Sequence, residues 1–185
     1  YTIAQQQNAR WFRQLGSTIS EEWAIPKIIE TFRAAPEIYD AAAHFIEAGD
    51  WIVGQLTRNF TKNNCALGFK TGWTEEDGFP SDYFSQVDAL LGQTIEQKLK
   101  APVKKIGDCA GTLTADWATR LGLSEGIAVA TCIIDAHAGV IGAGVHESGT
   151  LLMVMGTSTC HLMVHDELHE IEGISGVVKD SIIPG

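Results

Sequence analysis

A single carboxylate, Asp135, stands between an apolar run and a series of small residues in CIIDAHAGVIGAG, residues 132–144. The apolar run predicts a buried strand, and the small residues predict a closely packed helix. Burying an ionised carboxylate is costly, but the N–H groups and dipole of a helix N-terminus can stabilise it. Ligands bind at the carboxyl ends of strands in open α/β sheets. We therefore predict that Asp135 is a general base, with helix capping as the alternative.

A second polar group lies at a predicted turn between two apolar runs, in MVMGTSTCHLMV, residues 153–164. Two apolar runs around such a turn are typical of a β-hairpin. Backbone N–H groups and hydroxyls that converge on one turn can bind a phosphate. The predicted phosphate-binding residues are Gly156, Thr157, Ser158 and Thr159. The alternative is an ordinary hairpin turn.

Lys70 is a candidate for binding a substrate, because it follows small residues in NNCALGFKTGW, residues 63–73. Small residues allow a ligand to approach closely, and an ammonium group is a good partner for a hydroxyl-rich or phosphorylated molecule. The alternative is a solvated surface lysine.

The histidines raise the possibility of a metal site. Asp135 and His137 are two residues apart, and His161, His165 and His169 follow at intervals of four. Both spacings occur in metal sites. They suggest a metal-dependent hydrolase using Asp135 and His137 as the alternative function, although we assign no residue as a metal ligand.

The elements that would position these residues alternate between helices and buried strands, which indicates an α/β fold. Helical periodicity predicts one helix between Ser20 and Pro36. Ser20 is its expected N-cap, Pro26 lies in its first turn, and Pro36 ends it. Segment 61–73 predicts a loop or short element, and segment 124–135 predicts a strand buried on both faces. Further predicted helices lie within 1–15, 51–57 and 85–99, after Thr114 as N-cap, and within 136–145.

Composition excludes some classes of function. The formal net charge of −10 disfavours nucleic-acid binding, which needs clustered Lys and Arg. No apolar stretch reaches the roughly 18 residues of a membrane span, and no secretory signal is visible. The four cysteines form no CxxC pair, so we expect reduced thiols in a cytoplasmic protein.

Several motifs together resemble the FGGY carbohydrate kinases. The segment DAHAGVIGAG followed by GTSTCHLMV resembles the family's D-x-x-A-G-x-x-G-x-G segment and the Gly-Thr turn after it. EEWAIPKIIE resembles its P-K-x-x-W region, although Ile29 and Glu30 replace the usual aromatic residue there. AGDWIVGQLTRN resembles D-W-L-x-x-x-L-T-G, with Arg58 in place of the common Gly, and GFKTGW and GISGVVKDSIIPG add to the resemblance.

This resemblance implies an actin-like ATPase fold, with two RNase-H-like α/β domains around a cleft. The chain would be an internal piece that holds part of the first domain and the start of the second. Residues 1–147 would be the later part of the N-terminal sugar-binding domain. Residues 148–185 would be the first hairpin and the start of the C-terminal ATP-binding domain.

The resemblance also implies an activity, the ATP-dependent phosphorylation of a hydroxyl of a ketopentose with Mg²⁺. Asp135 would be the catalytic base, and Lys70 would face the sugar together with Asp135, His137 and Trp51. The turn at Gly156–Thr159 would bind ATP. The expected partners are the sugar, ATP and a second copy in a homodimer, with no nucleic acid or membrane. A non-catalytic actin-like module that senses sugar is a further alternative.

Overall fold

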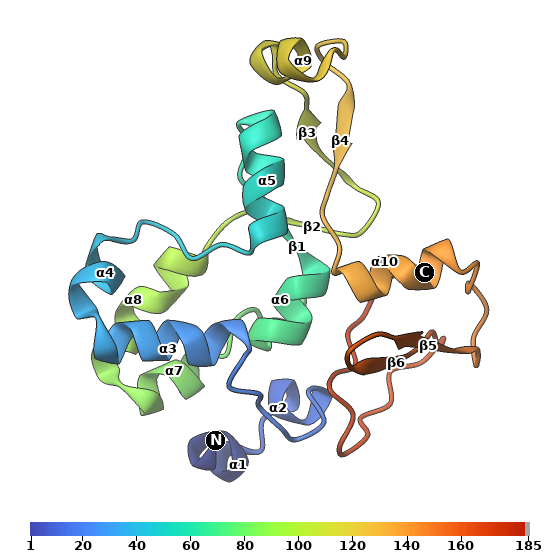
Figure 1. Cartoon of the computed structure of the whole chain (residues 1–185). Helices are drawn as coiled ribbons and strands as arrows, with labels where there is room; N and C mark the ends of the chain where they lie inside the picture. Colours follow the sequence, from blue (N-terminus) through green and yellow to red (C-terminus); the bar gives the residue numbers. More distant parts are fainter. Residues whose placement is uncertain (184–185) are drawn as a thin grey trace. The chain divides into compact units, whose positions relative to one another are not determined.

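The computed structural model describes residues 1–183, and these fold into two compact units (Figure 1). The first unit comprises Tyr1–Ile46, Leu67–Ala101 and His169–Val178. Among the described residues, the second comprises Glu47–Ala66, Pro102–Leu168 and residues 179–183. This division differs from the predicted boundary after residue 147, which concerns the complete protein and stays a prediction.

The first unit is helical, and its core lies between short amphipathic helices (Figure 1). Leu91, Ile95 and Leu99 recur every fourth residue and are buried on one face of α8. Asp88 caps this helix, accepting hydrogen bonds from the backbone N–H groups of Leu90 and Leu91 at 2.9 and 3.3 Å. The helices of this unit are α1 (Thr2–Gln7), α2 (Arg10–Gln14), α3 (Ala24–Ala34), α4 (Pro36–Ala41), α7 (Ser81–Val87) and α8 (Ala89–Leu99).

The described residues of the second unit form helices and three two-stranded sheets. The β1–β2 pair is parallel, and the β3–β4 and β5–β6 pairs are antiparallel. The elements are α5 (Ala48–Thr57), β1 (Lys62–Asn63), β2 (Val103–Lys104), β3 (Cys109–Thr112), α9 (Ala115–Leu121), β4 (Ala128–Ala130), α10 (Asp135–Gly142), β5 (Leu151–Met155) and β6 (Thr159–Met163). Helix α6 (Asn64–Thr71) begins in this unit, and its residues from Leu67 onward belong to the first.

Several local predictions are confirmed. Pro26 lies in the first turn of α3, and the helix ends at Ala34, before Pro36. Thr114 is at the N-cap position of α9, although its hydroxyl caps nothing. The hairpin forms where the sequence predicts it.

Three predictions about elements are wrong. Segment 61–73 is not a loop but β1 and the buried helix α6, because its small residues permit close packing. The strand expected over 124–135 is only β4, three residues long and largely exposed, because it pairs with β3 alone. The N-cap of α3 is Trp23, and Ser20 instead accepts a hydrogen bond from the backbone N–H of Glu22.

Over residues 1–183, none of the helices has both the length and the apolar character that a membrane-spanning helix requires.

Candidate active site

Asp135 is the first residue of α10, and its side chain is exposed. One carboxylate oxygen accepts a hydrogen bond from the backbone N–H of Ala136 at 2.8 Å. The N-cap position belongs to Ile134, so the alternative that Asp135 is the N-cap is wrong. The expectation of a buried carboxylate at a strand end is also wrong, because the side chain is exposed. An exposed carboxylate at the start of a helix is accessible to a ligand.

His137 lies two residues further along α10, and its ring is buried. The ring Nδ1 is 2.9 Å from the Sγ of Cys65, which is itself buried in the first turn of α6. Burial lowers the pKa of His137 from its ordinary value, and the negative charge of Asp135 opposes this effect. The first turn of α10 therefore carries an exposed carboxylate and a buried imidazole whose charged form is disfavoured by burial.

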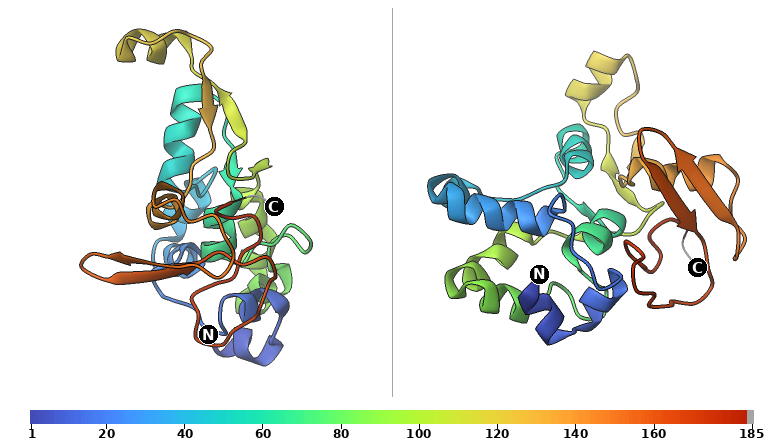
Figure 2. Two further views of the ribbon diagram at one scale, coloured as in Figure 1. Left: turned by 90° about the vertical axis from the view of Figure 1, so that its right-hand side faces the viewer. Right: turned by 60° about the horizontal axis from the view of Figure 1, so that its bottom comes forward.

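Helix α10 packs against the hairpin of β5 and β6, as Figures 1 and 2 show. A Cβ at Gly139 would lie 3.8 Å from the Val154 side chain, which is ordinary van der Waals contact. The same unit therefore brings the helix with Asp135 and His137 against the hairpin that carries the predicted phosphate-binding turn.

The turn at Gly156–Thr159 joins β5 to β6 and is exposed. The backbone N–H of Gly156 donates to the carbonyl of Ser158 at 2.9 Å, so this amide is used within the turn. The backbone of Gly156 is not left-handed, and a Cβ there would meet its nearest atom at 3.7 Å. The groups presented to a ligand include the three exposed hydroxyls, those of Thr157, Ser158 and Thr159.

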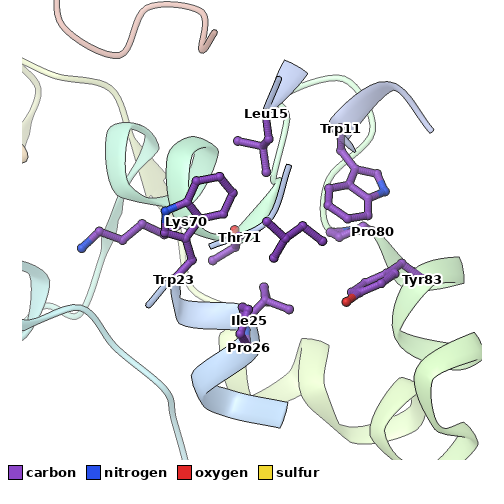
Figure 3. Close-up of a pocket in the computed structure, with 10 residues that line it drawn as sticks. Trp11, Leu15, Trp23, Ile25, Pro26, Lys70, Thr71, Pro80 and Tyr83 are labelled. Atoms are coloured by element: carbon purple, nitrogen blue, oxygen red, sulfur yellow. The ribbon is translucent and has the colours of Figure 1, made fainter. Parts of the chain in front are cut away.

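The other two predicted substrate-binding residues lie in different surroundings. Trp51 is exposed on α5 in the second unit. Lys70 is in the last turn of α6 and belongs to the first unit. It lines a cavity of about 10 Å³, room for roughly one water molecule, and its ammonium points away from the other lining side chains (Figure 3). The other residues around this cavity are mostly apolar, and they include Trp11, Leu15, Trp23 and Tyr83.

A buried polar cluster forms around Asp50, the residue before Trp51 in the sequence. Asp50, which is 2 % exposed, accepts hydrogen bonds from the backbone N–H and side-chain amide of Asn63 at 3.1 and 2.8 Å. The Asn63 side-chain oxygen accepts from the backbone N–H of Ala66 at 2.6 Å and so supports the start of α6. No sequence pattern indicated this cluster, because the predicted helix began at Trp51 and segment 61–73 was expected to be a loop or short element.

Burial dominates the ionisation of this cluster. It raises the pKa of Asp50, and the hydrogen bonds from Asn63 and the charge of Lys62 oppose the shift. It also lowers the pKa of Lys62, opposed by the charges of Asp50 and Glu47. Removing one of two opposite buried charges leaves the other charge buried without compensation, which is costly.

The histidines with metal-site spacing do not form a cluster. His161 and His165 belong to the second unit, and His169 belongs to the first. Within the part of the chain that the structure describes, no three His, Cys, Asp or Glu side chains are grouped to hold a metal ion.

No protein-family model matches the chain. The ribulokinase of Staphylococcus aureus strain MRSA252 is 47 % identical over 184 residues, which cover 100 % of this chain. The chain is homologous to a segment of the ribulokinases. It spans about a third (34 %) of the length of that relative, and the ribulokinase of strain Newman gives the same identity and coverage.

Solved structures of sugar kinases share the fold. A xylulose kinase from Rhodospirillum rubrum aligns with a TM-score of 0.71 at 18 % identity, covering 91 % of this chain and 34 % of that one. A gluconate kinase from Lactobacillus acidophilus aligns with a TM-score of 0.69 at 16 % identity, covering 85 % and 30 %. The chain therefore has part of the actin-like fold of the sugar kinases, and the predicted fold and resemblance are confirmed.

Proposed function

We propose that the complete protein is a carbohydrate kinase that transfers the γ-phosphoryl group of ATP to a hydroxyl of a ketopentose. The proposed reaction converts L-ribulose to L-ribulose 5-phosphate, a step in L-arabinose breakdown. The observation that carries the proposal is the 47 % identity to ribulokinases along the whole chain. The exposed carboxylate of Asp135 at the start of α10 supports it.

In the proposed reaction Asp135 acts on the sugar hydroxyl. Its carboxylate accepts the proton of the hydroxyl as the oxygen attacks the γ-phosphorus, and the bond from that phosphorus to the bridging oxygen of ADP breaks. Positioning and charge stabilisation contribute most of the catalysis in such reactions. The hydrogen bond from the Ala136 N–H to the carboxylate limits its rotation and leaves the other oxygen for the sugar.

The residues of the turn fit a phosphate group. The hydroxyls of Thr157, Ser158 and Thr159 would donate to phosphate oxygens, whereas the Gly156 N–H is used inside the turn. When bound, Mg²⁺ neutralises phosphate charge, and it is held largely by the phosphates of ATP, water and one or two carboxylates. We assign it no protein ligand.

A panel of sugars tests this proposal. The complete protein, ATP and Mg²⁺ are incubated with L-ribulose, other ketopentoses and polyols, and the formation of ADP and sugar phosphate is measured. We expect the highest kcat/KM for L-ribulose. Sugar binding without ATP turnover would instead favour the sugar-sensing module, and metal-dependent hydrolysis without ATP would favour the hydrolase.

Lys70 is proposed to contact the sugar, so Lys70→Met should raise the sugar KM more than the ATP KM. A charged hydrogen bond contributes roughly 1.5–3 kcal/mol, which corresponds to about tenfold or more in KM. Steady-state kinetics of the complete protein measure both constants. The control is Lys27→Met, which removes a lysine whose side chain is 50 % exposed and should change neither constant. Equal increases in both constants would contradict a role toward the sugar.

The turn is proposed to bind ATP through its hydroxyls, so Thr157→Val combined with Ser158→Ala should raise the ATP KM about tenfold or more. The sugar KM should stay the same, because these hydroxyls are assigned to the phosphate alone. Thr119→Val is the control, since this exposed threonine lies on α9 in the same unit. An unchanged ATP KM in a folded double variant would show that the hairpin turn does not bind phosphate.

A further inference from the structure

Cys65 and His137 form a buried pair between two helices of the second unit. Their Sγ and Nδ1 atoms are 2.9 Å apart, within hydrogen-bond distance, although the residues are 72 positions apart in the sequence. Cys65 is 0 % exposed and His137 is 7 % exposed. We propose that Cys65 is a positioning residue that holds His137 in the neutral tautomer with its proton on Nε2.

The direction of the hydrogen bond follows from the chemistry of the two groups. A thiol is a weak donor and a weaker acceptor, whereas an unprotonated imidazole nitrogen is a good acceptor. The S–H of Cys65 therefore donates to Nδ1 of His137. Transfer of the proton would produce a buried thiolate and imidazolium, and burial disfavours that charged pair.

The tautomer decides what His137 can do. With the lone pair of Nδ1 engaged by the thiol, Nε2 carries the remaining proton and acts only as a donor. His137 therefore cannot accept the proton of a substrate hydroxyl. That role is left to the carboxylate of Asp135 on the same turn of α10.

This division of roles deepens the proposed function and rests on it for the identity of the substrate. His137 would donate from Nε2 to a sugar oxygen, and Cys65 would fix the plane and the tautomer of the ring. Serine is the conservative replacement at position 65, because it keeps a donor on the same carbon. Alanine removes the donor and leaves the helix backbone unchanged.

Nuclear magnetic resonance of the complete protein labelled with ¹⁵N-histidine tests the tautomer directly. His137→Gln assigns the signal, and the spectra at neutral pH distinguish a protonated from an unprotonated ring nitrogen. We expect Nδ1 unprotonated and Nε2 protonated in the wild type, a mixture of tautomers in Cys65→Ala, and the wild-type state in Cys65→Ser. Cys109→Ala, which removes an exposed thiol, is the control and should leave the signal unchanged.

A protonated Nδ1 in the wild type would overturn the proposal, and this test needs no variant at position 65 to fold. An unchanged tautomer in folded Cys65→Ala would also overturn it. The kinetic expectation is a sugar KM raised about tenfold in Cys65→Ala and restored in Cys65→Ser, with the ATP KM unchanged. A shifted tautomer with an unchanged sugar KM would overturn the role toward the sugar. If the complete protein phosphorylates no sugar, the proposed function fails, while the spectra still decide the role of Cys65.

Discussion

Replacing Asp135 with Asn in the complete protein is expected to lower kcat by about 10²–10⁴-fold, the usual contribution of general base catalysis. The amide of Asn has the same shape as the carboxylate and can still accept the hydrogen bond from the Ala136 N–H, but it cannot accept a proton. The side chain is exposed, so the fold and the affinity for ATP should be retained. Steady-state kinetics, a melting curve and ATP titration measure the three quantities.

Asp116→Asn is the matched control for this substitution. Asp116 is another exposed aspartate in the first turn of a helix, α9, where it pairs with Arg120 on the surface. Its substitution should leave kcat within about twofold of the wild type, since surface pairs contribute little. Near-wild-type turnover in Asp135→Asn would contradict the assignment of Asp135 as the base.

Replacing Asp50 with Ala is expected to destabilise the fold by about 1–3 kcal/mol for each buried donor of Asn63 that loses its acceptor. The change leaves two buried donors of Asn63 without their acceptor and leaves Lys62 buried without the opposite charge of Asp50. Because Asn63 in turn supports the start of α6, the loss should extend to that helix. The urea midpoint of the complete protein measures the loss.

Two further variants identify the cause. Asp50→Asn keeps an acceptor for Asn63 but removes the charge, so its loss of stability should be smaller than that of Asp50→Ala. Asp116→Ala removes an exposed aspartate of the same unit and should change the midpoint little. Similar losses in Asp50→Ala and Asp116→Ala would show that the buried cluster does not stabilise the fold.

The elements that could be predicted are those whose determinants are local. Two apolar runs around a turn fix the hairpin, the spacing of Leu91 and Ile95 fixes the buried face of α8, and Pro36 fixes the end of α3. Each depends on residues close together in the sequence.

The elements that could not be predicted depend on distant partners. An apolar run such as 124–135 suggests burial, but how much of it forms a strand depends on what it pairs with, and β4 pairs only with β3. Small residues in segment 61–73 suggest a loop when taken alone. They form the buried helix α6 because other residues pack against them: a Cβ at Gly68 would clash with the side chain of Val178.

The candidate site shows the same limit. Asp135 and His137 are two residues apart on the first turn of α10, so their proximity follows from the sequence. The contact of His137 with Cys65 and that of Asp50 with Asn63 join different elements, and no local sequence pattern indicates either. Cys65 in particular is compatible with a simple apolar core residue until its partner is known.

A single-turnover rapid-quench experiment on the complete protein with Asp135→Asn tests whether Asp135 is the base in the chemical step. Enzyme in excess is mixed with ATP labelled at the γ-phosphate and saturating L-ribulose, and labelled sugar phosphate is followed in the first turnover. We expect the wild type to form this product and the variant to form it about 10²–10⁴-fold more slowly, with ATP bound equally well. The same rate of the chemical step in both proteins would contradict that role of Asp135.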